Sequence, residues 1–439
     1  MGEKQQEDRS MITKELNRVT LKKSKENVTG KMGLGWIGHC LRDYGLKAII
    51  DKHYLGRRNS NRQIEASRKI EASVLMFIAG GQRIEDIENL RVDSALVKVL
   101  GWGKMISPDT LRDFLKDKRN AAKLRRINHE LTIKVMRESE VGEFTYDNDA
   151  TYIDSNKNSA EYSYQKKRQY SGLLGFIPEL DICSTMDFRR GNVSPCDGIL
   201  NQLRKAVAQA KEAGKKIAIF RSDSAAHSNE IFKECAKEDI KYYISLSKNL
   251  AIKEMINSMD KKSWKRLSGK YEGGSEEYAE MVYVTNAGES ARMLVLRWKN
   301  PDVTLFDQNP YCYHAIGTND NEISPMAWLE KHNGRMNSEN YNKEVKSGFN
   351  CDYTPSHDFE MNRCYFLLGI LAYNVVQIMK LFYLSGRARK WTIKTLRYHF
   401  INVCGKIIKT ARRYICKIIN VTDSTFDLFR SCLFHLKMG

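Results

Sequence analysis

Hydrophobic and polar positions change their spacing near residue 140, and the change divides the chain into a helical part and a strand-rich part. Between residues 33 and 79 apolar residues recur at intervals close to 3.6, which predicts helices. The pair Gly80-Gly81 predicts the end of the last of these helices. Residues 83–117 predict further compact helices, one of which should start at Ser107-Pro108, with serine as the N-cap.

A strand-like alternation begins at Phe144 and continues to about residue 192. Three strands in this stretch are followed by a predicted helix from about Gly198 to Ala213 and by the apolar strand IAIF at 217–220. This order predicts an RNase H-like core of α/β class. Residues 249–320 also alternate with period two, in AEMVYVTN and ARMLVLRW, and predict a β-rich insertion.

The last quarter of the chain predicts helices of two kinds. Cys364 to Gly386 is the most apolar stretch, but Asn374, Gln377 and Lys380 interrupt it, so it predicts a buried helix rather than a membrane span. Residues 391–417 interleave Lys and Arg with Tyr and Ile, which we interpret as a basic helix that faces DNA phosphates.

The charge of the chain narrows the class of partner. The 439 residues carry 72 Lys and Arg against 53 Asp and Glu, a formal charge of +19. Residues 380–439 hold thirteen Lys and Arg against two acids, and so account for +11 of it. A surplus of this size indicates a nucleic-acid partner, although an anionic membrane or a ribosome would also satisfy it.

The cysteines and the N-terminus bear on the compartment. Ten cysteines occur without a CxxC pair or a Cys/His cluster at zinc-ligand spacing, which indicates reduced thiols in a cytoplasmic protein. The first ten residues are charged and lack the apolar run of a secretion signal.

Carboxylates at strand ends are the candidate catalytic groups. In DNDAT, a strand that turns Phe144 and Tyr146 to one face turns Asp147 and Asp149 to the other. Asp223 follows the strand at 217–220, at the carboxyl end where open α/β sheets bind ligands. A structural role in a turn is the alternative for Asp147 and Asp149.

A polar stripe supplies the third candidate carboxylate. HNGRMNSENYNKEVK, residues 332–346, predicts one helix, and at about 100° per residue its Arg335, Glu339, Asn342 and Lys346 share a face. A carboxylate flanked by cations suits a site that holds divalent metal and phosphate together. A solvated amphipathic surface would have the same spacing.

These residues resemble a known family. Arg335, Glu339 and Lys346 match the Tyr-x2-Arg-x3-Glu-x6-Lys signature of DDE transposases of bacterial insertion sequences, in the branch that opens with His-Asn-x-Arg, here His332 and Asn333. The family form Asp-x-Asp-x-Thr, which DNDAT resembles, has its metal ligand at the second acid.

Three further segments resemble the same family. GGQRIEDIENLRVD with SPDTLRDFL is similar to its N-terminal region, and residues 189–192 are similar to its Arg-x-Gly-Asn segment. Arg-Ser-Asp-Ser around Asp223 is similar to its Arg-x-Asp-Ser-Gly-Phe, with Ala225-Ala226 in place of Gly-Phe. The resemblance therefore spans four separate segments in the expected order.

The resemblance implies an enzyme with defined sites. Asp149, Asp223 and Glu339 would be catalytic and would hold two Mg²⁺ ions, for which Mn²⁺ could substitute, with Asp147 as the reserve for the first acid. The DNA-binding residues implied are His332, Asn333, Arg335, Asn342 and Lys346.

It also implies an activity and partners. The activity would be cut-and-paste transposition by end nicking, a hairpin intermediate and strand transfer, on terminal inverted repeats and target DNA, by a homodimer associated with the bacterial nucleoid. An inactive DNA-binding repressor, a domesticated derivative and another RNase H-like nuclease are the alternatives.

The implied domain layout has four parts. A helical DNA-binding region spans residues 1–140, the RNase H-like core spans 141–248 and 321–385, the β-rich insertion spans 249–320, and a basic helical region spans 386–439. Within the family the insertion often carries an aromatic residue that stacks a flipped base, for which Trp264 and Trp298 are candidates. Glu360 is the competitor of Glu339, but it lacks flanking cations.

Overall fold

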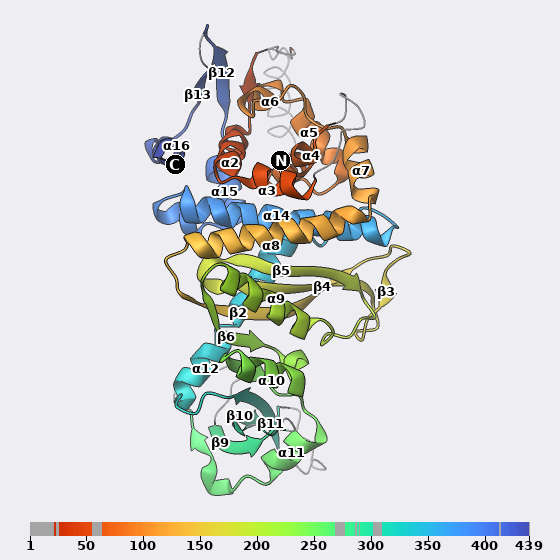
Figure 1. Ribbon diagram of the computed structural model, residues 1–439, viewed down its shortest axis with the longest axis vertical. Helices are drawn as coiled ribbons and strands as arrows, with labels where there is room; N and C mark the ends of the chain where they lie inside the picture. The colour runs from red at the N-terminus through yellow and green to blue at the C-terminus, as the bar shows by residue number, and fades with distance from the viewer. Residues whose placement is uncertain are drawn as a thin grey trace, which may run out of the picture.

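The computed structural model is a mixed α/β protein built around one large sheet (Figure 1). It describes residues 22, 26–54, 64–267, 277–285, 288, 290–301, 310–411 and 414–438. Within these residues the large sheet has ten strands, and helices cover both of its faces. The predicted α/β class is confirmed. The predictions for residues 1–21 lie outside the described residues.

The middle of the sheet consists of five strands in the order β5-β4-β2-β6-β7. Their bounds are Glu143–Asp154 for β2, Arg168–Ile177 for β4, Ile182–Arg190 for β5, Lys216–Ser222 for β6 and Lys241–Ser245 for β7. The first three strands along the chain pair antiparallel, whereas β6 and β7 run parallel to β2. The short β3, Glu161–Tyr162, pairs with β4 at the edge of the sheet.

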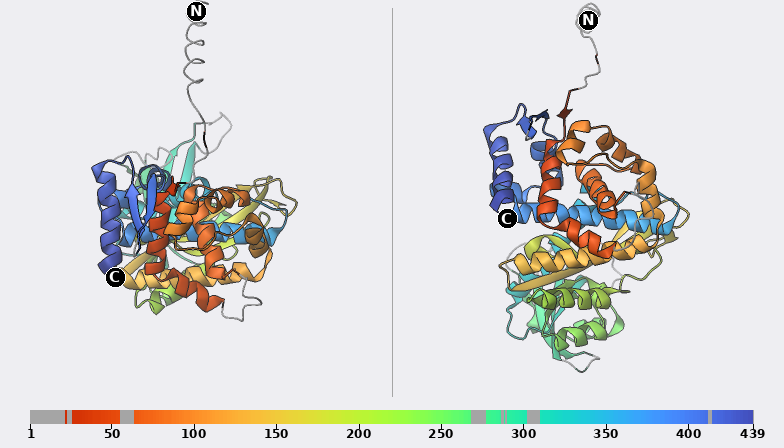
Figure 2. Two further views of the ribbon diagram at one scale, coloured as in Figure 1. Left: turned by 90° about the horizontal axis from the view of Figure 1, so that it is seen from above. Right: turned by 45° about the horizontal axis from the view of Figure 1, so that its top comes forward.

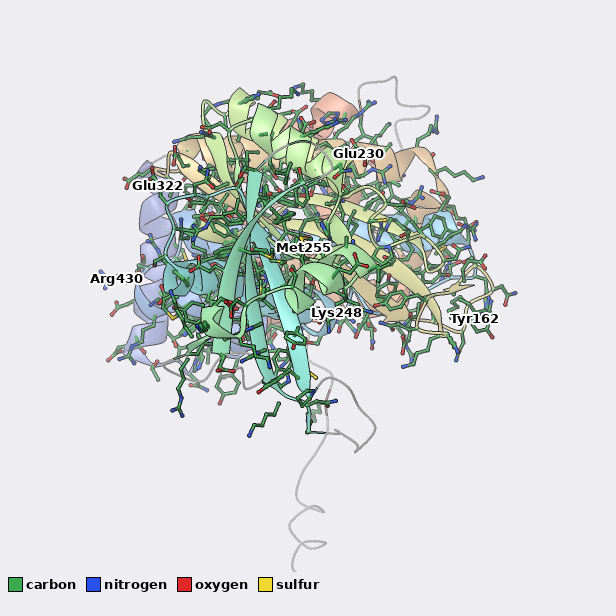
Figure 3. The ribbon with its side chains drawn as sticks, turned by 90° about the horizontal axis from the view of Figure 1, so that it is seen from below. Tyr162, Glu230, Lys248, Met255, Glu322 and Arg430 are labelled. Carbon is green, nitrogen blue, oxygen red and sulfur yellow. The ribbon has the colours of Figure 1, made fainter. Side chains whose placement is uncertain are left out.

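The β-rich region after residue 249 continues this sheet. Its strands are β8 (Lys265–Arg266), β9 (Glu277–Val284), β10 (Ser290–Lys299) and β11 (Tyr311–Thr318). Strand β11 pairs antiparallel with β7, so the described insertion strands extend the central sheet. Figure 3 looks at this end of the molecule. Lys248, two residues before α11 (Leu250–Asn257), and Met255 within α11 lie beside these strands.

Two long helices separate the sheet from the N-terminal helices. Helix α8, Arg119–Glu138, and helix α14, Phe359–Phe382, lie side by side against β5 (Figure 1). The N-terminal helices pack on their far side: α2 (Met32–Asp43), α3 (Leu46–His53), α4 (Ala66–Ala79), α5 (Ile87–Arg91), α6 (Ser94–Val99) and α7 (Pro108–Lys116). The predicted helix end is at Gly80, with φ +96°, and Ser107 caps α7 by accepting from the Thr110 amide at 3.2 Å.

Helix α14 is long and apolar enough to cross a membrane by length and composition alone. It is the one such helix among the described residues, and 89% of its most apolar window is buried inside the protein. Asn374 Oδ1, which interrupts the apolar run, accepts a hydrogen bond from the Cys183 amide at 2.8 Å. The prediction of a buried helix is confirmed.

The helical prediction for the C-terminal region is wrong between residues 405 and 418. Strands β12 (Gly405–Lys409) and β13 (Tyr414–Ile418) pair antiparallel and join β1 (Val28–Thr29) in a second sheet (Figure 2). Consecutive isoleucines favour a strand because β-branched side chains pack well on a pleated surface, and β1, which supplies the partner for β12, is far away in sequence. Only α15 (Ile393–Leu396) and α16 (Asp423–Met438) are α-helical here.

The remaining helices contact strands of the central sheet. They are α9 (Ile199–Glu212), α10 (Asn229–Lys237), α12 (Pro325–Asn333) and α13 (Met336–Lys343), followed by a π-helical turn at Glu344–Gly348. Asn148 of β2 donates to Gln202 of α9 at 2.8 Å, whereas its neighbour Asp149 accepts from Asn342 of α13 at 2.8 Å. The two faces of β2 therefore look at α9 and at α13 respectively.

Candidate active site

Two of the candidate acids lie next to each other because of the register between β2 and β6. These strands are parallel, and Asn148 is paired with Ser222. Asp149 follows Asn148 within β2, and Asp223 follows Ser222, the last residue of β6. Asp223 accepts a hydrogen bond from the Ala225 amide at 2.9 Å, which fixes the turn after the strand. The structure thus brings these two predicted carboxylates together.

Asp149 is in a strongly perturbed environment. Burial is the main cause that raises its pKa to about 6, and the negative charges of Asp223 and Glu339 raise it further, while Arg335 opposes them. A carboxylate that two other carboxylates repel is stabilised by a nearby cation. Asp223 and Glu339 are therefore near enough to Asp149 for their charges to raise its pKa.

Asp147 has a different role from Asp149. It is fully buried, and Arg221 of β6 binds both of its oxygens, Nε to Oδ1 at 2.6 Å and Nη2 to Oδ2 at 2.7 Å. The same guanidinium donates through Nη1 to the carbonyl of Lys331 in α12 at 3.0 Å. Asp147 is therefore committed to an ion pair beneath the site, and Asp149 is the acid whose surroundings fit a ligand role.

The predicted single helix over residues 332–346 is wrong. Helix α12 ends at Asn333, α13 begins at Met336, and Gly334 lies at the junction. A Cβ atom on Gly334 would stand 2.0 Å from Nη1 of Arg221, so the close passage of the guanidinium requires glycine here. The π-helical turn adds a second irregularity, with the Phe349 amide bonded to the Glu344 carbonyl at 3.1 Å.

Despite the break, most of the predicted stripe still faces one site. A cavity of about 400 Å³ is lined by Asp149 from β2 and by Glu339, Asn342 and Lys346 from α13 and the π turn. Glu339 is exposed. The Nζ atom of Lys346 donates to the Tyr152 carbonyl of β2 at 2.8 Å, which ties the π turn to the strand that carries Asp149.

A family model described as "Transposase DDE domain group 1" matches residues 12–438. The chain belongs to this transposase family. The resemblance to DDE transposases is thereby confirmed, whereas the branch of bacterial insertion sequences stays a prediction. Membership makes the protein a DNA-binding and DNA-cleaving enzyme at the level of the family. No curated protein matches the chain. Among solved structures, the cryo-EM structure of the piggyBac transposase synaptic complex with hairpin DNA is similar at 12% identity and a TM-score of 0.44, covering 82% of this chain and 80% of that chain.

DDE transposases generally use divalent metal ions, and the donor set of this transposase fits such an ion in kind. Asp149, Asp223 and Glu339 supply carboxylate oxygens, which hard cations prefer. Oδ1 of Asn342 is a further oxygen that is buried and has no partner among the described residues. In the part of the chain that the structure describes, no three Asp, Glu, His or Cys side chains are grouped closely enough to hold one ion. The residues therefore fit the ion in chemistry.

The remaining members of the predicted DNA-binding set differ in exposure. His332 is 2% exposed, and its Nε2 atom lies 3.1 Å from Ser245 Oγ. Burial, with help from His314 and Arg335, lowers the pKa of His332 to about 3, so the ring is neutral. A buried neutral ring cannot meet a phosphate, whereas Asn333 and Arg335 are partly exposed. The burial of His332 argues against the contact that the sequence suggested for it.

Several other residues of the transposase acquire clear partners. Glu360, the competitor of Glu339, is paired with Arg363 on α14 at 3.1 Å, so the prediction that it lacks a flanking cation is wrong. Trp264 carries the guanidinium of Arg297 over its ring, 3.9 Å from the centroid, while Trp298 is partly exposed on β10. Arg189, in the segment similar to Arg-x-Gly-Asn, donates to Ser171 Oγ at 2.8 Å and to the Asp197 carbonyl, and so anchors the turn before α9.

Sequence reasoning missed Arg221 and Gly334. A signal for Arg221 was present, because Arg221-x-Asp223 and Asp147-x-Asp149 repeat the same two-residue spacing on strands that turned out to be neighbours. Because β2 and β6 pair in a register that sets Asp147 opposite Arg221, the equal spacing also sets Asp149 beside Asp223 on the same face of the sheet. Nothing local indicates Gly334, since the guanidinium that it accommodates comes from 113 positions earlier in the chain.

Proposed function

We propose that this transposase moves a bacterial insertion sequence by cut-and-paste transposition, with Asp149, Asp223 and Glu339 as its catalytic acids. Two observations carry the proposal: the register of β2 and β6 sets Asp149 beside Asp223, and Asp149 and Glu339 line the same cavity of about 400 Å³. Two strands and a helix thus contribute one acid each to a single locality.

The chemistry proposed is a series of phosphoryl transfers. Water attacks the phosphodiester at the element end and releases a 3′ hydroxyl, which attacks the opposite strand to give a hairpin. Water opens the hairpin, and the 3′ hydroxyl then attacks target DNA. In the two steps with water, the oxygen of water replaces the leaving 3′ oxygen and a 5′ phosphate remains, whereas in the two steps with a 3′ hydroxyl one ester oxygen replaces another at phosphorus. No covalent link to the protein is required.

The three acids would hold two Mg²⁺ ions, replaceable by Mn²⁺, which when bound activate the attacking oxygen and stabilise the leaving 3′ oxygen. Asn342 orients Asp149 through its 2.8 Å hydrogen bond and leaves Oδ1 of that carboxylate free of this donor. The Oδ1 atom of Asn342 is buried and has no partner among the described residues.

Arg335, Asn333 and Lys346 are the residues proposed to contact the DNA backbone. The Nε atom of Arg335 is buried without a partner in the described part of the chain, and its charge lowers the pKa of Asp149, so the guanidinium lies near the acids. Arg suits phosphate because its planar fork gives two parallel hydrogen bonds. His332 and Asn342 support these residues from within.

The layout proposed for the chain follows the same interpretation. The strand order β5-β4-β2-β6-β7, with three antiparallel strands followed by two parallel ones, supports an RNase H-like core at 141–248 and 321–385. Residues 1–140 would bind the terminal repeats, 249–320 would form the insertion, and 386–439 would form a basic C-terminal region. A homodimer in the cytoplasm, associated with the nucleoid, would join two element ends.

The test is a labelled linear duplex that carries the end of the element, incubated with the protein and Mg²⁺ or EDTA and run on a denaturing gel. The parent should give nicks and a hairpin at the element boundary with Mg²⁺ and none with EDTA. Glu339→Gln should abolish cleavage and leave binding of the end within about twofold, because it removes one ligand charge and keeps the shape. Glu330→Gln, an exposed glutamate on α12, is the matched control and should cleave at the parental rate.

Cleavage at the parental rate by Glu339→Gln would overturn the assignment of the third acid. Binding of the element end without cleavage by the parent, with Mg²⁺ or with Mn²⁺, would instead favour an inactive DNA-binding repressor. The two outcomes can be distinguished, because the first changes only the role of Glu339 and the second removes the proposed activity of the whole site.

A further inference from the structure

The hairpin of β12 and β13 carries an unusual arrangement of charge on one of its faces. In its register Lys406 stands directly opposite Lys417, and Ile408 stands opposite Ile415. Because alternate residues of a strand point to opposite sides, these four side chains share one face. Val28 of β1, which pairs with Lys406, extends the same face. We call these five residues the outer face of the ribbon.

The opposite face of the hairpin is the one that holds it to the protein. Ile407 is 4% exposed, and Cys416 and Ile418 pack against the main core. On the outer face, Val28 and Ile415 are each 37% exposed, and none of the three apolar residues there packs against the core in the described structure. The apolar residues of the outer face therefore lie outside the hydrophobic core of the described chain.

The two lysines on this face repel each other. Like charges directly opposite in an antiparallel pair destabilise it. Lys406 has one partner, the exposed Glu26 at 3.2 Å, and Lys417 has none among the described residues. No acidic residue occurs between 402 and 422 to balance the cations there. An anion placed between the two ammonium groups would remove this repulsion.

The hairpin is also placed to meet a large ligand. It projects from the body of the protein at the end opposite to β9–β11 (Figures 1 and 2). Its base is fixed, because β1 pairs with β12 and Thr29 Oγ1 donates to Asp93, the N-cap of α6, at 2.5 Å. A two-stranded ribbon is narrow enough to enter the major groove of a duplex.

We propose that the outer face of the β12–β13 ribbon binds duplex DNA through its phosphates, independently of base sequence. Lysine ammonium groups donate to phosphate oxygens, while the isoleucines offer no hydrogen bonds with which to distinguish one base pair from another. This surface is separate from the catalytic acids, and the inference rests on the proposed function only in taking DNA as the ligand.

The test compares the salt dependence of binding to a duplex that lacks the element end. Each phosphate contact contributes about 0.9 to the slope of log K against log salt. The double variant Lys406→Ala/Lys417→Ala should bind more weakly at low salt, with a slope smaller by about 2. The variant Lys406→Arg/Lys417→Arg, which keeps both charges, should bind with the parental slope.

The matched control removes the same charge elsewhere. Lys211→Ala/Lys237→Ala takes away two exposed lysines of α9 and α10, whose side chains are 63% and 66% exposed, and should leave the slope near the parental value. If the control lowers the slope as much as the ribbon variant does, or if the ribbon variant keeps the parental slope, the proposal is wrong. Should the double variant fold poorly, Lys417→Ala alone gives the same test, with a slope smaller by about 1.

The result is independent of catalysis. End cleavage with Mg²⁺ is measured on the same proteins, and a parent that binds but does not cleave would refute the proposed function while leaving the slope measurement valid. An unchanged slope together with normal cleavage would refute the ribbon and leave the proposed function standing.

Discussion

Replacing Gly334 by alanine should destabilise the protein, although alanine is the better helix former. Gly334 has φ −52° and ψ −22°, a right-handed helical conformation that alanine adopts without strain. At such a position the change from glycine to alanine by itself stabilises by about 0.4–1 kcal/mol. The contact with Arg221 reverses the expected sign.

The size of the effect follows from what holds Arg221 in place. The new methyl carbon would lie 2.0 Å from Nη1 and 3.0 Å from Cζ of Arg221, so the guanidinium must move by more than 1 Å. The side chain is flexible, but Asp147 binds it at two atoms. Loss of the hydrogen bond to Lys331 alone costs about 1.5–3 kcal/mol. Loss of the buried ion pair as well costs about 3–5 kcal/mol.

The assay is the midpoint of chemical denaturation together with the rate of end nicking. After the intrinsic gain from alanine is subtracted, Gly334→Ala should lose about 1–4 kcal/mol of stability. Nicking should fall by about 100-fold, because a displacement of about 1 Å passes to α13 and Glu339. Gly142→Ala, where a Cβ atom would meet nothing within 4 Å, is the control and should neither destabilise the protein nor slow nicking.

A double-mutant cycle isolates the contact. Lysine at position 221 lacks the Nη1 atom, so adding Gly334→Ala to Arg221→Lys should cost much less than adding it to the parent. An equal cost in both backgrounds, or a Gly334→Ala protein as stable as the parent, would refute the interpretation that the guanidinium dictates glycine at this junction.

Two further changes test the surroundings of the site. Lys346→Ala should weaken binding of the element end and reduce its salt slope by about 0.9, with Lys346→Arg close to the parent; a salt dependence identical to the parent's would contradict a phosphate contact. His332→Gln should reduce the loss of stability on acidification. The pKa of His332 is about 3 in the folded protein, whereas it is ordinarily 6.5. Below pH 6.5 the unfolded chain therefore takes up a proton that the folded chain does not, and the stability of the parent falls. Between pH 7.5 and 5.0 this amounts to about 2 kcal/mol, which denaturation midpoints at the two pH values would reveal, and an equal loss in parent and variant would count against the neutral buried ring.

The part of the chain that carries Asp149 and Asp223 could be predicted from the sequence because its signals are local. Alternating apolar and polar residues predict β2, and a short apolar run predicts β6. Counting residues then places Asp149 within β2 and Asp223 just after β6. The side of β2 that Asp149 occupies follows from the period of two. What counting could not give is the register between the strands, which makes the acids neighbours and joins Asp147 to Arg221.

The C-terminal region was mispredicted for a reason of the same kind. Lys, Arg, Tyr and Ile between residues 391 and 417 fit a helical stripe, but Ile407 and Ile408 also fit a strand, and the spacing alone does not distinguish the two. The decision comes from Val28 and Thr29, nearly 380 positions earlier, which supply the partner strand. Long-range pairing overrides local preference here.

The Asp147–Arg221 pair explains why an extra acid stands so close to the proposed ligands without joining them. A buried ion pair contributes little net stability compared with apolar residues of similar size, because desolvation cancels most of the attraction. Its value lies in geometry: one guanidinium fixes β2 through Asp147, β6 through its own backbone and α12 through Lys331. These elements carry or precede Asp149, Asp223 and Glu339. A loss of this pair should therefore disturb the relative placement of all three acids, whereas a change at one acid should leave the other two where they are.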